Sequence, residues 1–193
     1  GLDRGFSFQK NGLLDMRYEK KKGRKSAAET LERASESDLT KIFQNFGEER
    51  YARRLAAAII KSRKSAPIKT TEDLVRIIFK AISGSRGAAG KKTRIHPATR
   101  IFQALRIFVN DELENLSKAL DCLPEFMASG GRIAAISFHS LEDRIVKNGF
   151  RNMAKQRKAA ILTKKPIRPG LEEIAKNPRS RSAKLRSIIM NNE

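Results

Sequence analysis

Apolar residues recur every three or four positions from residue 26 to about residue 80, which predicts a series of short amphipathic helices. Two helix starts carry capping signals, in which Ser35 is followed by Asp38 and Thr70 by Asp73. Residues 1–25, by contrast, read as a glycine-containing loop. We therefore expect a small helical bundle without strands. Its apolar stripes contain Ala27, Ala28, Leu31 and Ala34; Leu39, Ile42, Phe43 and Phe46; Tyr51, Leu55, Ala58 and Ile59; and Leu74, Val75, Ile78 and Ile82.

The pattern changes after a basic, glycine-rich loop at residues 83–93. A long helix is predicted from Pro97 to Pro124, with an apolar stripe at Phe102, Leu105, Val109, Leu113, Leu116, Leu120 and Leu123.

The run 133–136 is apolar on both sides, as in a strand buried in a parallel sheet. Ser140 and Asp143 then predict a capped helix, and residues 161–163 and 185–190 are two further candidate strands. The order helix, buried strand, polar loop and helix is typical of a doubly wound α/β sheet.

Charge narrows the range of functions. The chain has 193 residues, 41 Lys and Arg against 21 Asp and Glu, and a formal net charge of +20. The net charge is +2 over residues 1–40, +11 over 41–104, −4 over 105–143 and +11 over 144–193. Such an excess indicates a polyanionic partner, with RNA or DNA as the default. The basic clusters are Arg50, Arg53 and Arg54, expected on one helical face; Lys91, Lys92 and Arg94; Arg100 and Arg106; and Arg179, Arg181, Lys184 and Arg186.

Several classes of protein are disfavoured. No apolar run approaches the ~18 residues that a membrane span needs, and no secretory leader is recognisable. The single Cys122 excludes a disulfide framework, and with only His96 and His139 beside it a zinc site is not expected. We therefore expect a cytoplasmic protein without a metal.

Candidate chemistry lies at the carboxyl end of the predicted strand, where α/β sheets bind ligands. Ser137, Phe138, His139 and Ser140 stand there, followed by Asp143. An aromatic ring beside hydrogen-bonding groups is suited to hold a flipped-out base. The alternative is that Ser140 and Asp143 only cap the helix and that His139 is structural.

Eight motifs, in order along almost the whole chain, resemble the RsmH/MraW family. They are RGFSF at 4–8, LDMR at 14–17, FGEER at 46–50, HPATRIFQALR at 96–106, VNDEL at 109–113, GGRI at 130–133, ISFHSLEDRIVK at 136–147 and NPRSRSAKLR at 177–186. Members of this family use S-adenosylmethionine to methylate N4 of a cytidine in small-subunit ribosomal RNA.

The resemblance implies an α/β fold, namely the C-terminal part of a class I methyltransferase (Rossmann-like) sheet with an inserted all-helical domain. Residues 1–24 and 96–193 would belong to the methyltransferase domain and residues 25–95 to the insert. It also implies a site in which Ser137, His139, Ser140 and Asp143 polarise the substrate. Substrate binding would fall to Phe6, Asp15, Arg17, Phe138 and Arg144. The partner would be small-subunit ribosomal RNA or the ribosomal particle, with a homodimer as an option.

The family's glycine-rich cofactor loop and acidic ribose-binding residue have no match here. We therefore expect the chain to correspond to the C-terminal two-thirds of a family member and to be inactive alone, with no identifiable cofactor-binding residue. Leu13 and Tyr18 also depart from the usual Pro and Met.

Two other functions remain open. The chain could be a non-catalytic RNA-binding module that uses the same basic surfaces. A helix-turn-helix DNA regulator built from residues 38–82 is a weaker alternative, because it leaves the strand and its polar loop unexplained.

Overall fold

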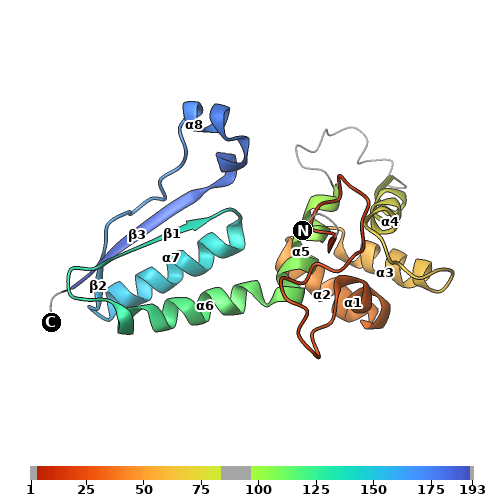
Figure 1. Cartoon of the computed structure of the whole chain (residues 1–193), viewed down its shortest axis with the longest axis horizontal. Coiled ribbons are helices and arrows are strands. Elements are labelled where there is room, and N and C mark those ends of the chain that lie inside the picture. Colours follow the sequence, from red (N-terminus) through yellow and green to blue (C-terminus); the bar gives the residue numbers. More distant parts are fainter. Residues whose placement is uncertain (1–3, 84–96, 192–193) are drawn as a thin grey trace. The chain divides into compact units, whose positions relative to one another are not determined.

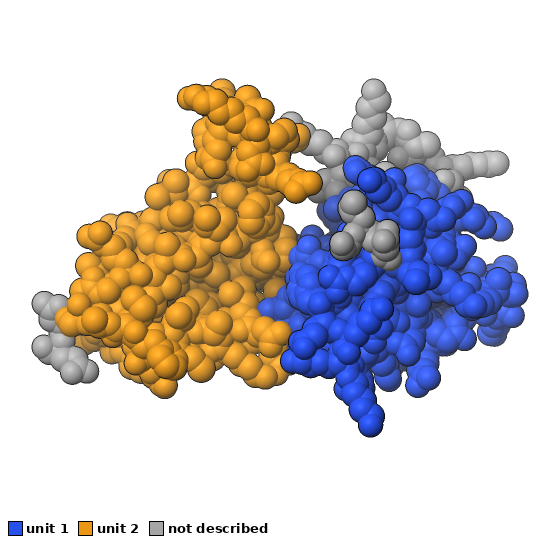
Figure 2. Space-filling view, in the orientation of Figure 1, with its two compact units in different colours: residues 1–112 blue, residues 113–193 orange. Residues whose placement is uncertain are grey.

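The computed structural model describes residues 4–83 and 97–191 and divides into two compact units, residues 1–112 (unit 1) and 113–193 (unit 2) (Figure 2). Each unit has its own hydrophobic core. The units do not coincide with the expected domain boundaries, because residues 4–24 and the helix that starts at Pro97 both pack in unit 1. Which residues belong to a methyltransferase domain and which to an insert stays a prediction.

Unit 1 contains the helical bundle predicted from residue 26 to about residue 80, together with the N-terminal loop and the helix that starts at Pro97, and within the described residues it contains no extended strand (Figure 1). Buried apolar side chains at helical spacing build its core, among them Leu31, Phe43, Leu55, Ile78 and Leu105. The helices are α1 (Ala27–Arg33), α2 (Glu36–Gly47), α3 (Ala52–Arg63), α4 (Thr71–Ser83) and α5 (Pro97–Asn110).

The predicted caps of α2 and α4 are confirmed. The backbone N–H of Asp38 donates to Ser35 Oγ at 3.1 Å, and that of Asp73 donates to Thr70 Oγ1 at 3.2 Å. Helix α1 begins with a further capping box, in which Ser26 N donates to the Glu29 carboxylate at 2.8 Å. These contacts satisfy backbone groups that have no partner inside the helix.

Helices α2 and α5 approach each other closely at Gly47. A Cβ atom built there would lie 2.8 Å from the backbone oxygen of Arg100 and 3.2 Å from Ala104 Cβ. Only glycine allows this approach without displacing the backbone of α5.

Unit 2 contains a three-stranded sheet with the order β1-β3-β2. Both pairs are antiparallel, with Ile133 opposite Ile188 and Ala159 opposite Met190. The elements are α6 (Glu112–Cys122), the 3₁₀ turn η2 (Leu123–Phe126), β1 (Arg132–Ser137), α7 (Ser140–Lys155), β2 (Ala159–Ile161), α8 (Leu171–Lys176), the 3₁₀ turn η3 (Pro178–Ser182) and β3 (Lys184–Met190).

Among the described residues, the strand at 133–136 does not lie in a parallel sheet, because it pairs antiparallel with β3. Ile133 and Ser137 are buried on the face that packs towards α6 and α7, whereas Ala134 is exposed on the opposite face and Ile136 is 60% exposed there. Within the described residues the strand therefore alternates between buried and exposed positions, as is usual in antiparallel sheets. The fold is mixed α/β, mostly helical, with a small antiparallel sheet.

The single long helix predicted from Pro97 to Pro124 is also wrong. The helix breaks at Asp111, whose φ of 52° lies in the left-handed region that Asp tolerates better than most residues. The Asp111 carboxylate accepts a hydrogen bond from Arg24 Nη2 at 2.8 Å. The apolar periodicity continues across this break and so did not reveal it. No helix in the described part of the chain has the length and apolarity to cross a membrane.

Candidate functional site

The loop between β1 and α7 is shaped by a capping box that the sequence analysis placed one residue too late. His139 is the N-cap, and its Nδ1 accepts a hydrogen bond from the backbone N–H of Glu142 at 3.3 Å. The Glu142 carboxylate accepts in return from the N–H groups of Phe138 (2.8 Å) and His139 (3.2 Å). The expected pair, Ser140 with Asp143, does not form this cap, because α7 already includes Ser140.

The environment of Glu142 favours its charged form. Burial raises the pKa of Glu142, but contact with the His139 ring and the two backbone hydrogen bonds outweigh it and bring the pKa down to about 2. The His139 Nε2 atom lies 3.3 Å from Glu142 Oε1 but makes no hydrogen bond among the described residues. Glu142 is therefore an anion that holds the loop, not a proton donor at neutral pH.

Asp143 ties α7 to β3. Arg186 Nε and Nη2 donate to its two carboxylate oxygens at 2.7 and 3.2 Å, and Lys184 Nζ lies 3.5 Å away. These hydrogen bonds from Arg186, together with its charge, hold the pKa of Asp143 below its usual value. Ser137 is buried, and its Oγ donates to the backbone oxygen of Lys184 at 3.4 Å. Both polar groups therefore stabilise the base of the loop.

Other site candidates on this loop reach solvent. Phe138 is 54% exposed, and Ser140 and Arg144 are exposed on the first turns of α7. The loop thus presents an aromatic ring, a hydroxyl and a guanidinium, which could stack on a base and contact its polar edge. The part that each residue plays with a substrate stays a prediction.

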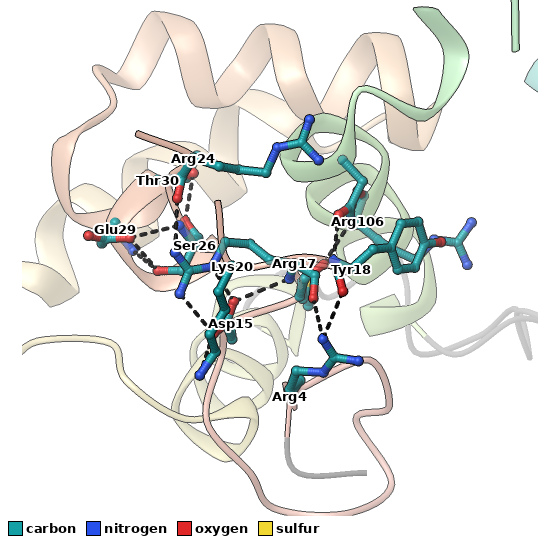
Figure 3. A network of polar contacts seen from close by, with 12 residues as sticks. Arg4, Asp15, Arg17, Tyr18, Lys20, Arg24, Ser26, Glu29, Thr30 and Arg106 are labelled. Carbon is teal, nitrogen blue, oxygen red and sulfur yellow. Dashed lines mark hydrogen bonds and ion pairs between the residues drawn. The ribbon is translucent and has the colours of Figure 1, made fainter. Parts of the chain in front are cut away.

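A polar network organises the other predicted substrate-binding segment, in the N-terminal loop of unit 1 (Figure 3). Arg17 Nε and Nη2 donate to the Asp15 carboxylate at 2.6 and 3.0 Å, and Arg17 Nη1 donates to the backbone oxygen of Arg24. The hydrogen bond from Arg17 is the main reason that the pKa of Asp15 is lowered. Arg4 Nη1 donates to the backbone oxygens of Arg17 and Tyr18, both at 3.0 Å.

Phe6, the third candidate in this loop, is stacked on Tyr18. Their ring centroids are 5.5 Å apart with an interplanar angle of 16°, and the Arg4 guanidinium lies 5.6 Å from the Phe6 ring centre. The Tyr18 hydroxyl donates to the Glu112 carboxylate at 3.0 Å. The methionine that the resemblance implies at this position could not donate this hydrogen bond.

Asn110, which no sequence pattern singled out, anchors this loop. Its side chain is buried, and Nδ2 donates to the backbone oxygen of Met16 at 2.7 Å while Oδ1 accepts from Tyr18 N at 2.8 Å. The only sequence signal was a polar residue directly after an apolar position, Val109, within the predicted stripe. A buried amide in that place needs polar partners.

The basic candidates of unit 1 differ in how they are engaged. The prediction that Arg50, Arg53 and Arg54 share a helical face is wrong for Arg50, which precedes α3 and lies 4.5 Å over the Tyr51 ring. All three are exposed. Arg100 donates to the backbone oxygen of Glu48, and Arg106 pairs with Glu112 through two hydrogen bonds of 2.9 and 3.0 Å.

In unit 2, Arg179 and Arg181 are exposed on η3, and neither has a carboxylate within 4.0 Å among the described residues. Lys184 contacts Asp143, and Arg186 is only 8% exposed, so the C-terminal cluster is partly structural. Lys91, Lys92, Arg94 and His96 lie outside the described residues.

Comparison with known proteins gives a match to the MraW methylase family over residues 1–191. Among curated relatives, the ribosomal RNA small subunit methyltransferase H of Persephonella marina is 47% identical over 184 residues, which are 95% of this chain and 61% of that protein. The proteins of the same name from Halothermothrix orenii and Rhodopseudomonas palustris are each 48% identical, covering 95% of this chain and 62% and 57% of theirs. The chain thus spans about three-fifths of the length of these relatives. Since the family match extends over almost every residue, the chain belongs to the MraW methylase family.

Proposed function

We propose that this chain is the RNA-binding, substrate-side part of an enzyme that methylates N4 of a cytidine in small-subunit ribosomal RNA with S-adenosylmethionine. The family match over residues 1–191 carries the proposal. The net charge of +20 supports it, because uncompensated positive charge favours RNA.

The chemistry requires positioning more than acid or base strength. The lone pair of a cytosine amino group is delocalised into the ring, so N4 must be held in line with the methyl group it attacks. We propose that Phe138 stacks on the cytosine and that Ser140 and Arg144 contact its polar edge. His139, Glu142 and Asp143 then act as positioning residues, because they hold the loop through the cap and through Arg186.

The two carboxylates beside the carboxyl end of β1 do not fit a contact to the ribose of S-adenosylmethionine. The two carboxylates beside the carboxyl end of β1 are those of Glu142 and Asp143, and both are engaged, by backbone N–H groups and by Arg186. Neither is free to bind a ribose. We therefore assign no step of the transfer to a cofactor held by this chain.

A chimera tests the proposal, in which this chain replaces the matching region of the Persephonella marina relative. Methyl transfer to small-subunit RNA from labelled S-adenosylmethionine is expected. Phe138→Ala should lower turnover more than tenfold if it removes both stacking and alignment, whereas Phe126→Ala, an exposed control in η2, should not. A chimera that folds and binds RNA but transfers no methyl group to cytosine N4 would contradict the proposal.

The second candidate is an RNA-binding module without a methyl donor, favoured by the two engaged carboxylates. The chimera separates the two, because only it contains the relative's own donor-binding region. Methyl transfer by the chimera supports the enzyme, whereas salt-sensitive RNA binding without methyl transfer supports the module.

A further inference from the structure

An open pocket of about 440 Å³ lies in unit 1 among α1, α2 and the end of α5. None of the residues that the sequence analysis singled out for catalysis or binding lines it. Its lining includes the basic side chains of Lys25, Arg33 and Lys41 and the aromatic rings of Phe46 and Phe108. We call it the α2 pocket.

The apolar part of the α2 pocket is formed mainly by two phenylalanines. Phe108 is 40% exposed and Phe46 is half-buried. Their ring centroids lie 6.2 Å apart at an angle of 39°, so the pair forms a tilted aromatic surface. Asn45, one residue from Phe46, is exposed and adds an amide with two donors and an acceptor. An aromatic surface beside an amide matches the face and the edge of a nucleobase.

Three cations surround this surface. Lys25, Arg33 and Lys41 are exposed, and within the described residues none of them has a carboxylate within 4.0 Å. Asp38 is the one acidic residue in the lining, and its carboxylate accepts a 2.7 Å hydrogen bond from Ser35 at the start of α2. That bond lowers the pKa of Asp38 and directs the carboxylate to the helix cap. The pocket therefore keeps an excess of positive charge.

We infer that the α2 pocket binds one unpaired nucleotide of RNA, with its base against Phe108 and the flanking phosphates on Lys25 and Lys41. The inference rests on the proposed function for the presence of RNA, but it assigns a separate site in unit 1. An acidic peptide would match the cations but not the aromatic pair, since carboxylates have no flat apolar face to place on it. A nucleotide satisfies both features at once.

Binding of fluorescent RNA to the full chain provides the test. The probes are a single-stranded ten-nucleotide RNA, the same oligomer with abasic sites, and a polyglutamate peptide of equal charge. We expect Phe108→Ala to weaken binding of the base-bearing RNA about tenfold, within the range of aromatic stacking on one base. Binding of the abasic oligomer should not change, and Phe108→Tyr should restore wild-type affinity.

The lysines are tested by salt dependence. The Lys25→Ala and Lys41→Ala double variant should flatten the slope of log affinity against log salt by about 1.4, as expected for two lost phosphate contacts on a single strand. The control is the Lys61→Ala and Lys80→Ala double variant, which removes two exposed lysines of unit 1 that lie outside the pocket.

The outcomes separate this inference from the proposed function. If the wild-type chain binds RNA but the two double variants behave alike, or if Phe108→Ala affects the abasic oligomer equally, the pocket does not hold a nucleotide and the proposed function stands. If polyglutamate binding depends on Phe108 more than RNA binding does, the occupant is an acidic protein and the inference is wrong. A chain that binds no RNA overturns both.

Discussion

Arg186 of β3 donates two hydrogen bonds to Asp143 of α7, from Nε to Oδ1 at 2.7 Å and from Nη2 to Oδ2 at 3.2 Å. Both side chains are largely buried, at 10% and 16% exposed. The pair joins a strand to the helix that begins at the candidate site, and 43 residues separate its members. The loop that presents Phe138 therefore depends on a contact from a distant part of the sequence.

Removing one member of this pair should destabilise the chain strongly. Asp143→Ala leaves the Arg186 guanidinium buried without its partner, and we expect a loss of about 3 kcal/mol in the free energy of unfolding by urea. The Asp143→Ala and Arg186→Met double variant should recover much of that loss. The exposed pair Glu172 and Lys176, also 2.7 Å apart, is the control, since breaking it should change stability by less than about 0.5 kcal/mol. Equal effects of the two pairs would contradict the structural role.

Glu142 should make stability depend on acid pH. Its folded-state pKa, about 2, lies below the usual value of 4.5. The ionised form therefore stabilises the fold fully above pH 4.5, and this contribution is lost as the pH falls towards 2. We expect a loss of about 1–2 kcal/mol over that interval, allowing for solvent screening. The free energy of unfolding of Glu142→Gln should therefore fall less steeply than that of the wild type between about pH 5 and pH 2. An equally steep fall in the variant would argue against the cap.

Asparagine, but not alanine, should replace His139 as the N-cap of α7. His139→Ala removes the acceptor for the Glu142 N–H and should lower stability by about 1 kcal/mol. His139→Asn should restore it, because Asn is a strong N-cap residue. In the chimera we expect His139→Ala to lower turnover more than RNA affinity and His139→Asn to recover it. If His139→Asn is stable but still inactive, the imidazole itself acts on the substrate.

Gly47→Ala should disturb the contact between α2 and α5. The new methyl group would lie 2.8 Å from the backbone oxygen of Arg100, which cannot move aside without shifting α5. We expect a loss of about 1–3 kcal/mol in thermal or urea unfolding. Gly170→Ala is the control, because its φ of −74° is ordinary and no atom lies within 4 Å of a Cβ built there.

Asn110→Leu should release the N-terminal loop. The variant keeps a similar volume but leaves Tyr18 N and the backbone oxygen of Met16 without their side-chain partner. Limited tryptic digestion should then cut faster within the Lys20–Lys25 run, and stability should fall by about 1–3 kcal/mol. Gln44→Ala, an exposed amide of the same unit, should digest at the wild-type rate.

Local sequence patterns predicted the structure correctly where the residues that determine a helix or its cap lie within that one element. The stripe of Leu39, Ile42 and Phe43 predicted α2 because helical spacing alone places these residues on one face. The Ser35 and Thr70 caps were predictable because their partners are three residues away. The break at Asp111 was not, since apolar residues continue at the same spacing on both sides of it.

The sequence by itself determined the helical bundle, the presence of strands near 133–136 and 185–190, the basic character and the family resemblance, because each depends on composition or on neighbours a few residues apart. Only the tertiary structure decided the direction of strand pairing and which polar groups are engaged. The local sequence predicts that Asp143 caps a helix, whereas the structure shows that it accepts a hydrogen bond from Arg186 of β3. A short apolar run likewise fits a strand buried on both faces, but among the described residues the helices pack on the side of Ile133 and leave Ile136 60% exposed. Such long-range contacts are set by packing, which local spacing does not encode.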